Sequence, residues 1–406
     1  MKCRYCSNNL NHEFVDLINT PPSNSYLFQD ELNEPETYFP LKVFVCENCF
    51  LVQVDEYKKS DEIFNKNYAY FSSYSRTWLE HSKKYTDYII QRFGYNEQSL
   101  VIEIASNDGY LLQYFKEKNI QVLGVEPTES TAKVAEEKGI ETIIEFFGES
   151  FAKKLQAKGK KANLLLGNNV LAHVPNINDF VKGLKIALKE DGVVTMEFPH
   201  LMQLVKYNQF DTIYHEHFSY LSLFVVKQIF QKAGMEIFDV EKLTTHGGSL
   251  RIFARHVEDS SKPIESRVSK LIEEEKSEGL DKLEYYKNFQ FATNQVKYDF
   301  LNFLLENRNK KVIGYGAAAK GNTLLNFCGV KNDIIKFVVD ASPHKQGKYL
   351  PGSHIPIVSE KDIRQLQPNY VVIFPWNIKE EIENQLSYIR DWKGKFVVVI
   401  PKLLIY

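Results

Sequence analysis

The sequence has little of what marks proteins that bind nucleic acid or enter membranes. Its formal net charge is only −2 over 406 residues, and no basic run recurs along one face, which argues against nucleic acid as a partner. The start, Met-Lys-Cys-Arg, lacks the apolar core of a signal peptide, and no uninterrupted apolar stretch is long enough to span a bilayer. We therefore expect a cytoplasmic protein of two or three domains that binds no membrane. We expect a monomer and leave a homodimer open.

Cysteine is also scarce, and its placement is informative. Four of the five cysteines form two Cys-x-x-Cys pairs, Cys3 with Cys6 and Cys46 with Cys49. Two such pairs close a tetrahedral zinc site with four thiolates and no water position, as in structural sites. Disulfides or a redox pair fit less well, because there is no secretory signal and no thioredoxin-like strand and helix beside either pair. We predict one structural Zn²⁺, with the stretch over residues 27–40 looping out between the pairs.

From residue 100 onward, short apolar segments alternate with amphipathic ones. Strands are predicted over residues 100–104, 122–125, 162–166 and 192–198, helices over residues 111–118, 132–138, 177–188 and 223–233, and two closing strands over residues 235–241 and 249–255. This alternation is the βαβ signature of a parallel sheet.

A charged helical stretch over residues 264–308 leads to a second alternation. Its strands are predicted over residues 311–316, 335–340, 370–374 and 395–400. The sequence therefore predicts an α/β protein with a small zinc-binding domain over residues 1–58, a doubly wound core over residues 59–258, and a helical bridge with a second doubly wound domain over residues 259–406. Two such units leave a crevice, and ligands of open α/β sheets bind beyond the carboxyl ends of the strands.

The first strand of the core leads into a turn of small and polar residues that suggests a nucleotide-like ligand. Glu103 ends the strand, Ala105, Asn107 and Gly109 form the turn, and Glu126 ends the next strand, where a carboxylate can accept hydrogen bonds from both hydroxyls of a ribose. The Gly-x-Gly-x-x-Gly dinucleotide fingerprint is absent. S-adenosylmethionine, which has no pyrophosphate to bring against the backbone, is therefore preferred over NAD. The alternative is that both carboxylates simply end strands in solvent.

Several segments now add up to a family resemblance. In chain order they are the two Cys-x-x-Cys pairs and the stretches over residues 67–73, 103–109, 169–174, 214–220 and 316–326. Together they resemble the three-domain, S-adenosylmethionine-dependent sugar C-methyltransferases, which typically methylate C3 of a nucleotide-linked 4-keto deoxysugar. The resemblance covers essentially the whole chain and implies a class I methyltransferase core, a Rossmann-like C-terminal domain and a place for Asn169 near the cofactor. Ala105 departs from the family's usual glycine, and its methyl group is tolerated if the backbone φ there is below zero.

The Tyr-His-Glu-His segment that begins at Tyr214 offers two imidazoles, a carboxylate and a phenol within one turn of chain. C-methylation beside a ketone needs a base that removes a proton and a group that stabilises the enolate oxygen. The resemblance implies that His217 is the base, that Tyr214 and Glu216 lie around the reacting carbon, and that His173 and Tyr68 face the same pocket. A metal site is disfavoured because the two imidazoles are only two residues apart with no further His or Cys cluster nearby. A structural role remains the other alternative.

The diphosphate of a sugar nucleotide also needs a binding site, and two turns can supply one. The first holds His246, Gly248 and Arg251, and the second opens a helix with Lys320 and Asn322. We therefore expect the nucleotide between the second and third domains. As glycine-rich turns alone, both can equally be tight connections.

Competing functions remain open at this point. A related methyltransferase could act on another carbon or oxygen of a sugar nucleotide, and a zinc-ribbon binding protein with two degenerate Rossmann-like domains would catalyse nothing. An NAD-dependent oxidoreductase built on Gly314 and Gly316 ranks last, because the third fingerprint glycine is missing. The sequence favours the C-methyltransferase.

Overall fold

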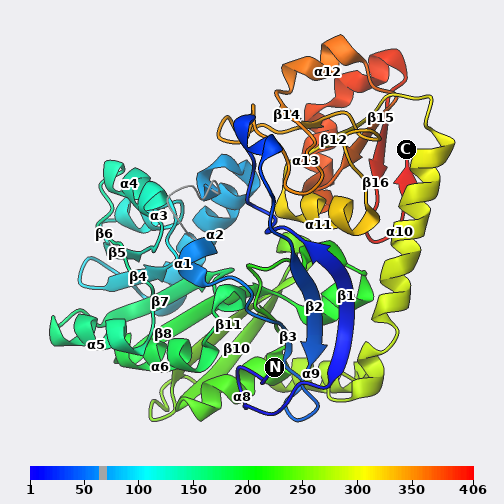
Figure 1. Cartoon of the computed structure of the whole chain (residues 1–406). Helices are drawn as coiled ribbons and strands as arrows, with labels where there is room; N and C mark the ends of the chain where they lie inside the picture. The colour runs from blue at the N-terminus through cyan, green and yellow to red at the C-terminus, as the bar shows by residue number, and fades with distance from the viewer. Residues whose placement is uncertain (64–70) are drawn as a thin grey trace.

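The computed structural model describes residues 1–63 and 71–406, and these residues form three sheets (Figure 1). The smallest sheet lies near the amino terminus and consists of β1 (His12–Thr20), β2 (Phe39–Val45), β3 (Val52–Val54) and β9 (Ser219–Tyr220), all antiparallel. One Cys-x-x-Cys turn precedes β1, and the other joins β2 to β3. β9 comes from the part of the chain that forms the central sheet, so that part supplies the last strand of the amino-terminal sheet.

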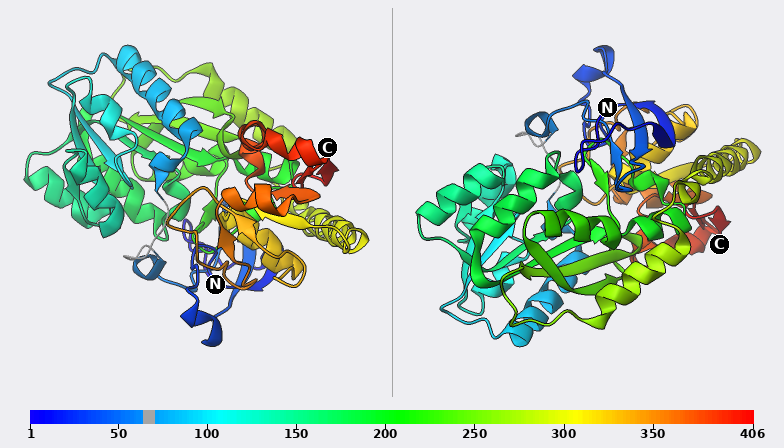
Figure 2. Two further views of the ribbon diagram at one scale, coloured as in Figure 1. Left: turned by 90° about the horizontal axis from the view of Figure 1, so that it is seen from above. Right: turned by 90° about the horizontal axis from the view of Figure 1, so that it is seen from below.

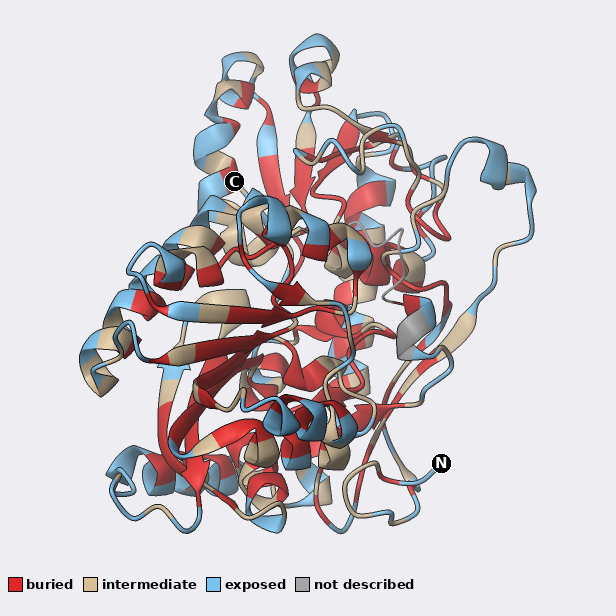
Figure 3. Cartoon of the chain, turned by 90° about the vertical axis from the view of Figure 1, so that its left-hand side faces the viewer, coloured by how far each residue is buried: buried red, intermediate tan, exposed pale blue. Residues whose placement is uncertain are grey.

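The central sheet has the strand order β10-β11-β8-β7-β4-β5-β6. Its strands are β4 (Leu100–Ile104), β5 (Gln121–Val125), β6 (Thr142–Ile143), β7 (Ala162–Asn168), β8 (Leu188–Pro199), β10 (Met235–Leu243) and β11 (Ser249–His256). The five strands from β6 to β8 are parallel, and the predicted closing pair of strands, β11 and β10, is present and antiparallel. β7 carries the apolar run over residues 164–166 and is buried at all of its residues except Asn163, which is typical of a parallel strand covered on both faces. Figure 3 shows that the sheet strands are largely buried.

Helices cover both faces of this sheet (Figure 2). In chain order they are α2 (Arg76–Phe93), α3 (Leu112–Lys116), α4 (Glu129–Glu137), α5 (Glu149–Ala157), α6 (Ile177–Ala187), α7 (Leu201–Lys206) and α8 (Leu223–Lys232), after the short α1 (Ser60–Ile63). Apolar residues of α2, α3 and α4 form the core on one face, and those of α5, α6 and α8 form the core on the other. The predicted alternation of strands and helices is confirmed.

The third sheet has the order β14-β13-β12-β15-β16-β17, with only the edge strand β17 antiparallel. Its elements are β12 (Val312–Tyr315), α11 (Ala319–Cys328), β13 (Val338–Val339), β14 (Ile357–Val358), α12 (Lys361–Leu366), β15 (Tyr370–Ile373), α13 (Lys379–Gln385), β16 (Lys395–Val398) and β17 (Leu404–Ile405). The helical stretch predicted before it is two helices, α9 (Ser266–Glu278) and α10 (Phe289–Glu306). The break falls at Gly279, which has φ +98° and ends α9 in the left-handed conformation that glycine accepts most readily.

Residues 21–38, here called the arm, loop out between β1 and β2 and reach the C-terminal domain. Leu27 and Tyr349 exchange two backbone hydrogen bonds, of 3.0 and 2.8 Å. Farther along, the carboxylate of Glu36 accepts the N–H of Gly352 and lies 3.0 Å from Nε2 of His354. The amino-terminal region therefore contacts both other parts of the chain. Within the described residues, no helix has the length and apolar character needed to cross a bilayer.

Candidate active site

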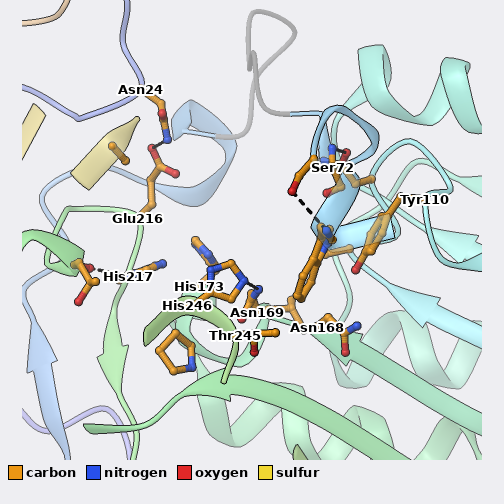
Figure 4. A pocket seen from close by; sticks show the side chains of 18 of the residues that line it. Asn24, Ser72, Tyr110, Asn168, Asn169, His173, Glu216, His217, Thr245 and His246 are labelled. Carbon is orange, nitrogen blue, oxygen red and sulfur yellow. Dashed lines mark hydrogen bonds between the residues drawn. The ribbon is translucent and has the colours of Figure 1, made fainter. Parts of the chain in front are cut away.

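A cavity of about 600 Å³ lies where the carboxyl edge of the central sheet faces the C-terminal domain (Figure 4). Its walls come from all three parts of the chain. Asn24 belongs to the arm, Glu126 and His217 belong to the domain of the central sheet, and Lys320 belongs to α11. The cavity therefore occupies the crevice that the sequence predicts between two doubly wound units.

The cofactor turn has the backbone of a tight strand-to-helix connection. Ala105, Asn107 and Gly109 all have positive φ, at 55°, 49° and 73°. The condition under which the Ala105 methyl group would be tolerated without strain, a φ below zero, is therefore not met, and the alanine carries a left-handed conformation at a cost of about 1 kcal/mol. Ala105 and Asn107 line the cavity. Gly109 does not line it, because its Cα packs against Ile140 so closely that an added methyl group would lie 2.5 Å from Cδ1.

Glu126 lines the cavity at the end of β5 and holds the turn together. Its two carboxylate oxygens accept the backbone N–H groups of Asn107 and Thr128, each over 2.9 Å. Burial raises the pKa of this carboxyl, and the two amides act in the opposite direction. Glu103 is fully buried outside the cavity wall, and burial raises its pKa well above the usual value.

Two asparagines at the end of β7 complete this side of the cavity. Both amide atoms of Asn168 and Oδ1 of Asn169 are buried with no hydrogen-bond partner in the described part of the chain. Buried polar atoms left this way cost free energy unless a ligand or water satisfies them. A carboxylate for ribose hydroxyls, a tight turn and open amide groups fit S-adenosylmethionine, and Glu126, Asn107 and Asn169 are the residues that would hold it.

His217 lies in a turn after the short 3-10 helix over Phe210–Thr212 and lines the cavity. Its Nδ1 lies 2.8 Å from the carbonyl oxygen of Thr212, and because a carbonyl only accepts, Nδ1 carries the hydrogen. Nε2 is then the proton acceptor. Burial is the main cause that lowers the pKa of His217 well below its usual value, followed by the nearby His173.

The aromatic rings around His217 form one cluster. The ring centres of Tyr214 and His217 are 4.0 Å apart. The ring centre of His173 lies 4.6 Å from that of His217, with the two rings edge to face. Burial lowers the pKa of His173 to about 4, so both imidazoles are neutral near pH 7. Tyr214, Glu216, His217 and His173 thus share the cavity, as expected. Tyr68 lies outside the described residues.

His215, the other imidazole of the segment, points elsewhere. Its Nε2 lies 3.2 Å from the carbonyl oxygen of Pro40 in β2, and its ring packs edge-on against Phe39. The two histidines therefore do not form a shared metal-ligand pair, and the described residues place a cysteine cluster alone in metal-binding geometry.

Only two of the five residues expected near the diphosphate lie in the cavity wall, namely His246 and Lys320. Nζ of Lys320 donates to Asn377 over 2.8 Å and lies 4.4 Å from the centre of the Trp376 ring. Burial lowers the pKa of Lys320 to about 8, and the charge of Asp211 partly offsets this. Lys320 therefore remains largely cationic at neutral pH.

Gly248, Arg251 and Asn322 lie outside the cavity wall. Arg251 is buried in β11 directly opposite Glu197 of β8, and its guanidinium donates to Glu197 and Glu241. Gly248 packs on the side chain of Gln203, and the amide of Asn322 donates to a carbonyl of the arm. The diphosphate roles expected for these three residues have no support from their positions.

Some wall residues carried no usable signal in the sequence. Trp78 of α2 stacks on His81 at 4.9 Å and meets the edge of His246 at 5.0 Å. Asn168 and Asn377 line the wall from the two doubly wound units, and Asn24 does so from the arm. A helix periodicity predicts that Trp78 is buried, but nothing local indicates that a cavity lies beside it.

The four paired cysteines meet in one place. Their Sγ atoms all lie within 4.8 Å of one another, with Cys3 and Cys49 at 3.6 Å and Cys6 and Cys46 at 3.5 Å. Sulfurs about 2.3 Å from a tetrahedral zinc ion are separated by about 3.8 Å. Donor chemistry and spacing therefore fit a structural Zn²⁺ site, as predicted.

Known protein families match almost the entire chain. Family models match residues 3–64 as a zinc binding domain, residues 78–240 as a methyltransferase domain, and residues 244–401 as a C-methyltransferase C-terminal domain. The C-methyltransferase NovU of Streptomyces niveus is 33% identical over 404 residues, which cover 99% of this chain and 96% of the relative.

The solved structures that resemble the chain cover less than half of it. The PH0226 protein of Pyrococcus horikoshii OT3 has a TM-score of 0.38 at 16% identity, covering 46% of this chain and 95% of its own. An S-adenosylmethionine-dependent methyltransferase of Clostridium acetobutylicum has a TM-score of 0.35 at 10% identity, covering 44% and 92%. From the family models and the full-length relative, the chain belongs to the S-adenosylmethionine-dependent C-methyltransferases that carry an amino-terminal zinc-binding domain.

Proposed function

We propose that the enzyme methylates C3 of a nucleotide-linked 4-keto deoxysugar, after His217 has removed the C3 proton. The observation that carries the proposal is the hydrogen bond from Nδ1 of His217 to the carbonyl of Thr212, which leaves Nε2 as a proton acceptor on a ring that lines the cavity. A proton beside a ketone is acidic enough for an imidazole to remove when the enolate oxygen is stabilised. S-adenosylmethionine supplies the electrophilic methyl group.

Groups around His217 suit the remaining needs of this step. Tyr214, whose ring lies 4.0 Å from that of His217, carries a hydroxyl that can donate to the oxygen at C4 as negative charge develops there. Glu216 in the same wall can accept a hydrogen bond from a sugar hydroxyl and fix the ring. Burial of the cluster strengthens each of these interactions, because the local dielectric is low.

The C-terminal wall supports a sugar nucleotide as the carrier of that ketone. Lys320 is a half-buried cation in the cavity wall, and its charge can attract an anionic diphosphate. A cavity of about 600 Å³ suits a ligand of this size class.

Solvent exchange tests the proposed base directly. The native enzyme, loaded with S-adenosylhomocysteine, should wash deuterium from D₂O into C3 of the 4-keto sugar, and His217→Asn should not. Turnover of His217→Asn should fall by roughly 10²–10⁴, the usual contribution of a positioned general base. His215→Asn is the matched control, because its ring lies outside the cavity. Exchange at the native rate in His217→Asn would assign the base to another residue.

The substrate class needs a separate comparison. Sugar nucleotides with a ketone at C4 should be methylated on carbon, whereas the same compounds reduced to the 4-hydroxy form should be inert, since they form no enolate. Methylation of the reduced compounds on oxygen would contradict the proposal.

A further inference from the structure

The arm brings one residue of the amino-terminal region into the active site. The Nδ2 group of Asn24 donates to Oε1 of Glu216 over 2.7 Å, and both residues line the main cavity (Figure 4). The same two residues also line a smaller cavity of about 210 Å³, together with Lys58, Glu62 and Lys348. The pair therefore stands as a wall between the two cavities.

The backbone on either side of Asn24 is fixed by the C-terminal domain. The amide of Asn322 donates to the carbonyl of Ser23 over 2.6 Å, and the hydroxyl of Tyr26 donates to the carbonyl of Ala317 over 2.6 Å. Asn322 is 1% exposed, so this contact is shielded from water. Hydrogen bonds to the C-terminal domain, one buried at Ser23 and one partly buried at Tyr26, thus hold the arm on both sides of Asn24.

The first turn of α11 also holds the segment that carries Glu216. The hydroxyl of Thr323 donates to the carbonyl of Ile213 over 2.9 Å, just before Tyr214. It also lies 3.5 Å from the hydroxyl of Ser23. Neighbouring residues of one helix, Asn322 and Thr323, therefore fix both Asn24 and Glu216 relative to each other.

We propose that Asn24 is a positioning residue for the methyl transfer, which acts by orienting the carboxylate of Glu216 toward the substrate. The inference rests on the proposed function, because it takes Glu216 to contact the sugar. An amide donor at 2.7 Å fixes the rotamer of the Glu216 carboxylate. Asn322 and Thr323 of α11 lie outside the cavity wall and contribute indirectly, because they hold the segments that carry Asn24 and Glu216.

A double-mutant cycle tests whether Asn24 acts through Glu216. Asn24→Ala should lower kcat by about 10- to 100-fold while the KM for S-adenosylmethionine stays the same. In the Glu216→Ala background, Asn24→Ala should change kcat by less than about twofold, since the carboxylate that Asn24 orients is already gone. Ser25→Ala, an exposed neighbour on the arm, is the matched control and should keep native kcat. Melting temperatures and calorimetric cofactor affinity should stay native in all variants.

Asn24→Asp supplies a readout that a merely structural residue would not move. It places a second carboxylate against Glu216, and two carboxylates that close together share a proton at a raised pKa. The acid limb of kcat/KM should therefore move to higher pH by about one unit or more. The inference would be overturned if the acid limb of kcat/KM stayed in place in Asn24→Asp, or if the kcat losses of the two single variants multiplied in the double variant. Either result would leave the proposed function unaffected. No native turnover of any 4-keto sugar nucleotide would instead refute the proposed function, and the inference with it.

Discussion

The carboxylate of Glu275 on α9 lies 2.7 Å from Nε2 of the buried His200 and also accepts the first two backbone N–H groups of α8. The two N–H donors, from Leu223 and Phe224, have no partner within their own helix, because the first turn of a helix leaves its N–H groups open. Glu275 thus joins α9, α8 and the end of β8 through one buried charge.

Removing this carboxylate should destabilise the protein strongly. Glu275→Ala takes the partner from the ring of His200 and from the backbone N–H groups of Leu223 and Phe224, and we expect a loss of about 3–5 kcal/mol in the free energy of unfolding. Glu274→Ala, next in the chain, breaks only an exposed ion pair with Lys242 and should cost at most about 1 kcal/mol. Urea titrations of the two variants check the difference. Equal midpoints would mean that Glu275 does not organise this junction.

The acid limb of the kcat/KM profile should lie at an unusually low pH. The pKa of His217 lies well below its ordinary value through burial, so the base stays neutral down to pH values below 6.5. The value of kcat/KM should therefore be flat through pH 7 and fall only at more acidic pH. At the alkaline side, the pKa of Lys320 is about 8, so its charge is lost as pH rises through 8 and the KM for an anionic substrate should increase. Lys320→Met should abolish that alkaline rise, and a rise of unchanged size would place the titrating group elsewhere.

Replacing Glu126 should weaken cofactor binding more than it affects folding. Glu126→Ala removes an acceptor for ribose hydroxyls and also frees the N–H of Asn107 in the cofactor turn. We expect S-adenosylmethionine affinity to fall by about 1.5–3 kcal/mol, measured by calorimetry. Glu129→Ala, in the first turn of α4 but outside the cavity wall, is the control. Native affinity in Glu126→Ala would reject this cofactor placement.

Metal removal should impair activity although the four cysteines lie outside the cavity wall. One zinc ion per chain is expected from four thiolates, and Cys46→Ser should abolish its retention. Because β1 and β2 carry the arm, loss of the metal should also lower kcat. Cys328→Ala should keep the full zinc content, since this lone cysteine is buried in the C-terminal domain. A zinc-free protein with native turnover would contradict the expected link.

Local patterns in the sequence predict much of this molecule. The cysteine spacing predicts the zinc ligands, and the alternation of apolar segments predicts both doubly wound sheets. The Tyr-His-Glu-His segment predicts a catalytic cluster, and the structure places three of its four side chains in one cavity.

The roles of several residues could not be predicted from the sequence, because they depend on contacts between residues that are far apart in the chain. Arg251 resembles a diphosphate ligand until the register of β8 and β11 sets it opposite Glu197. Asn322 resembles a phosphate-binding residue until the arm supplies Ser23, which lies 299 residues earlier. Asn24 carries no local motif, and only the tertiary path of the arm reveals its contact with Glu216.

The pairing of β9 with β3 has a consequence for how the protein is made. The amino-terminal sheet gains its last strand only when Ser219 and Tyr220 have left the ribosome, after most of the methyltransferase core. Until then the edge of β3 offers unpaired N–H and C=O groups to other chains, as any open edge strand does. A fragment that ends at residue 58 lacks β9, so the edge of β3 would stay unpaired. The zinc-binding region alone would therefore be prone to associate with other chains, whereas in the full chain β9 covers this edge.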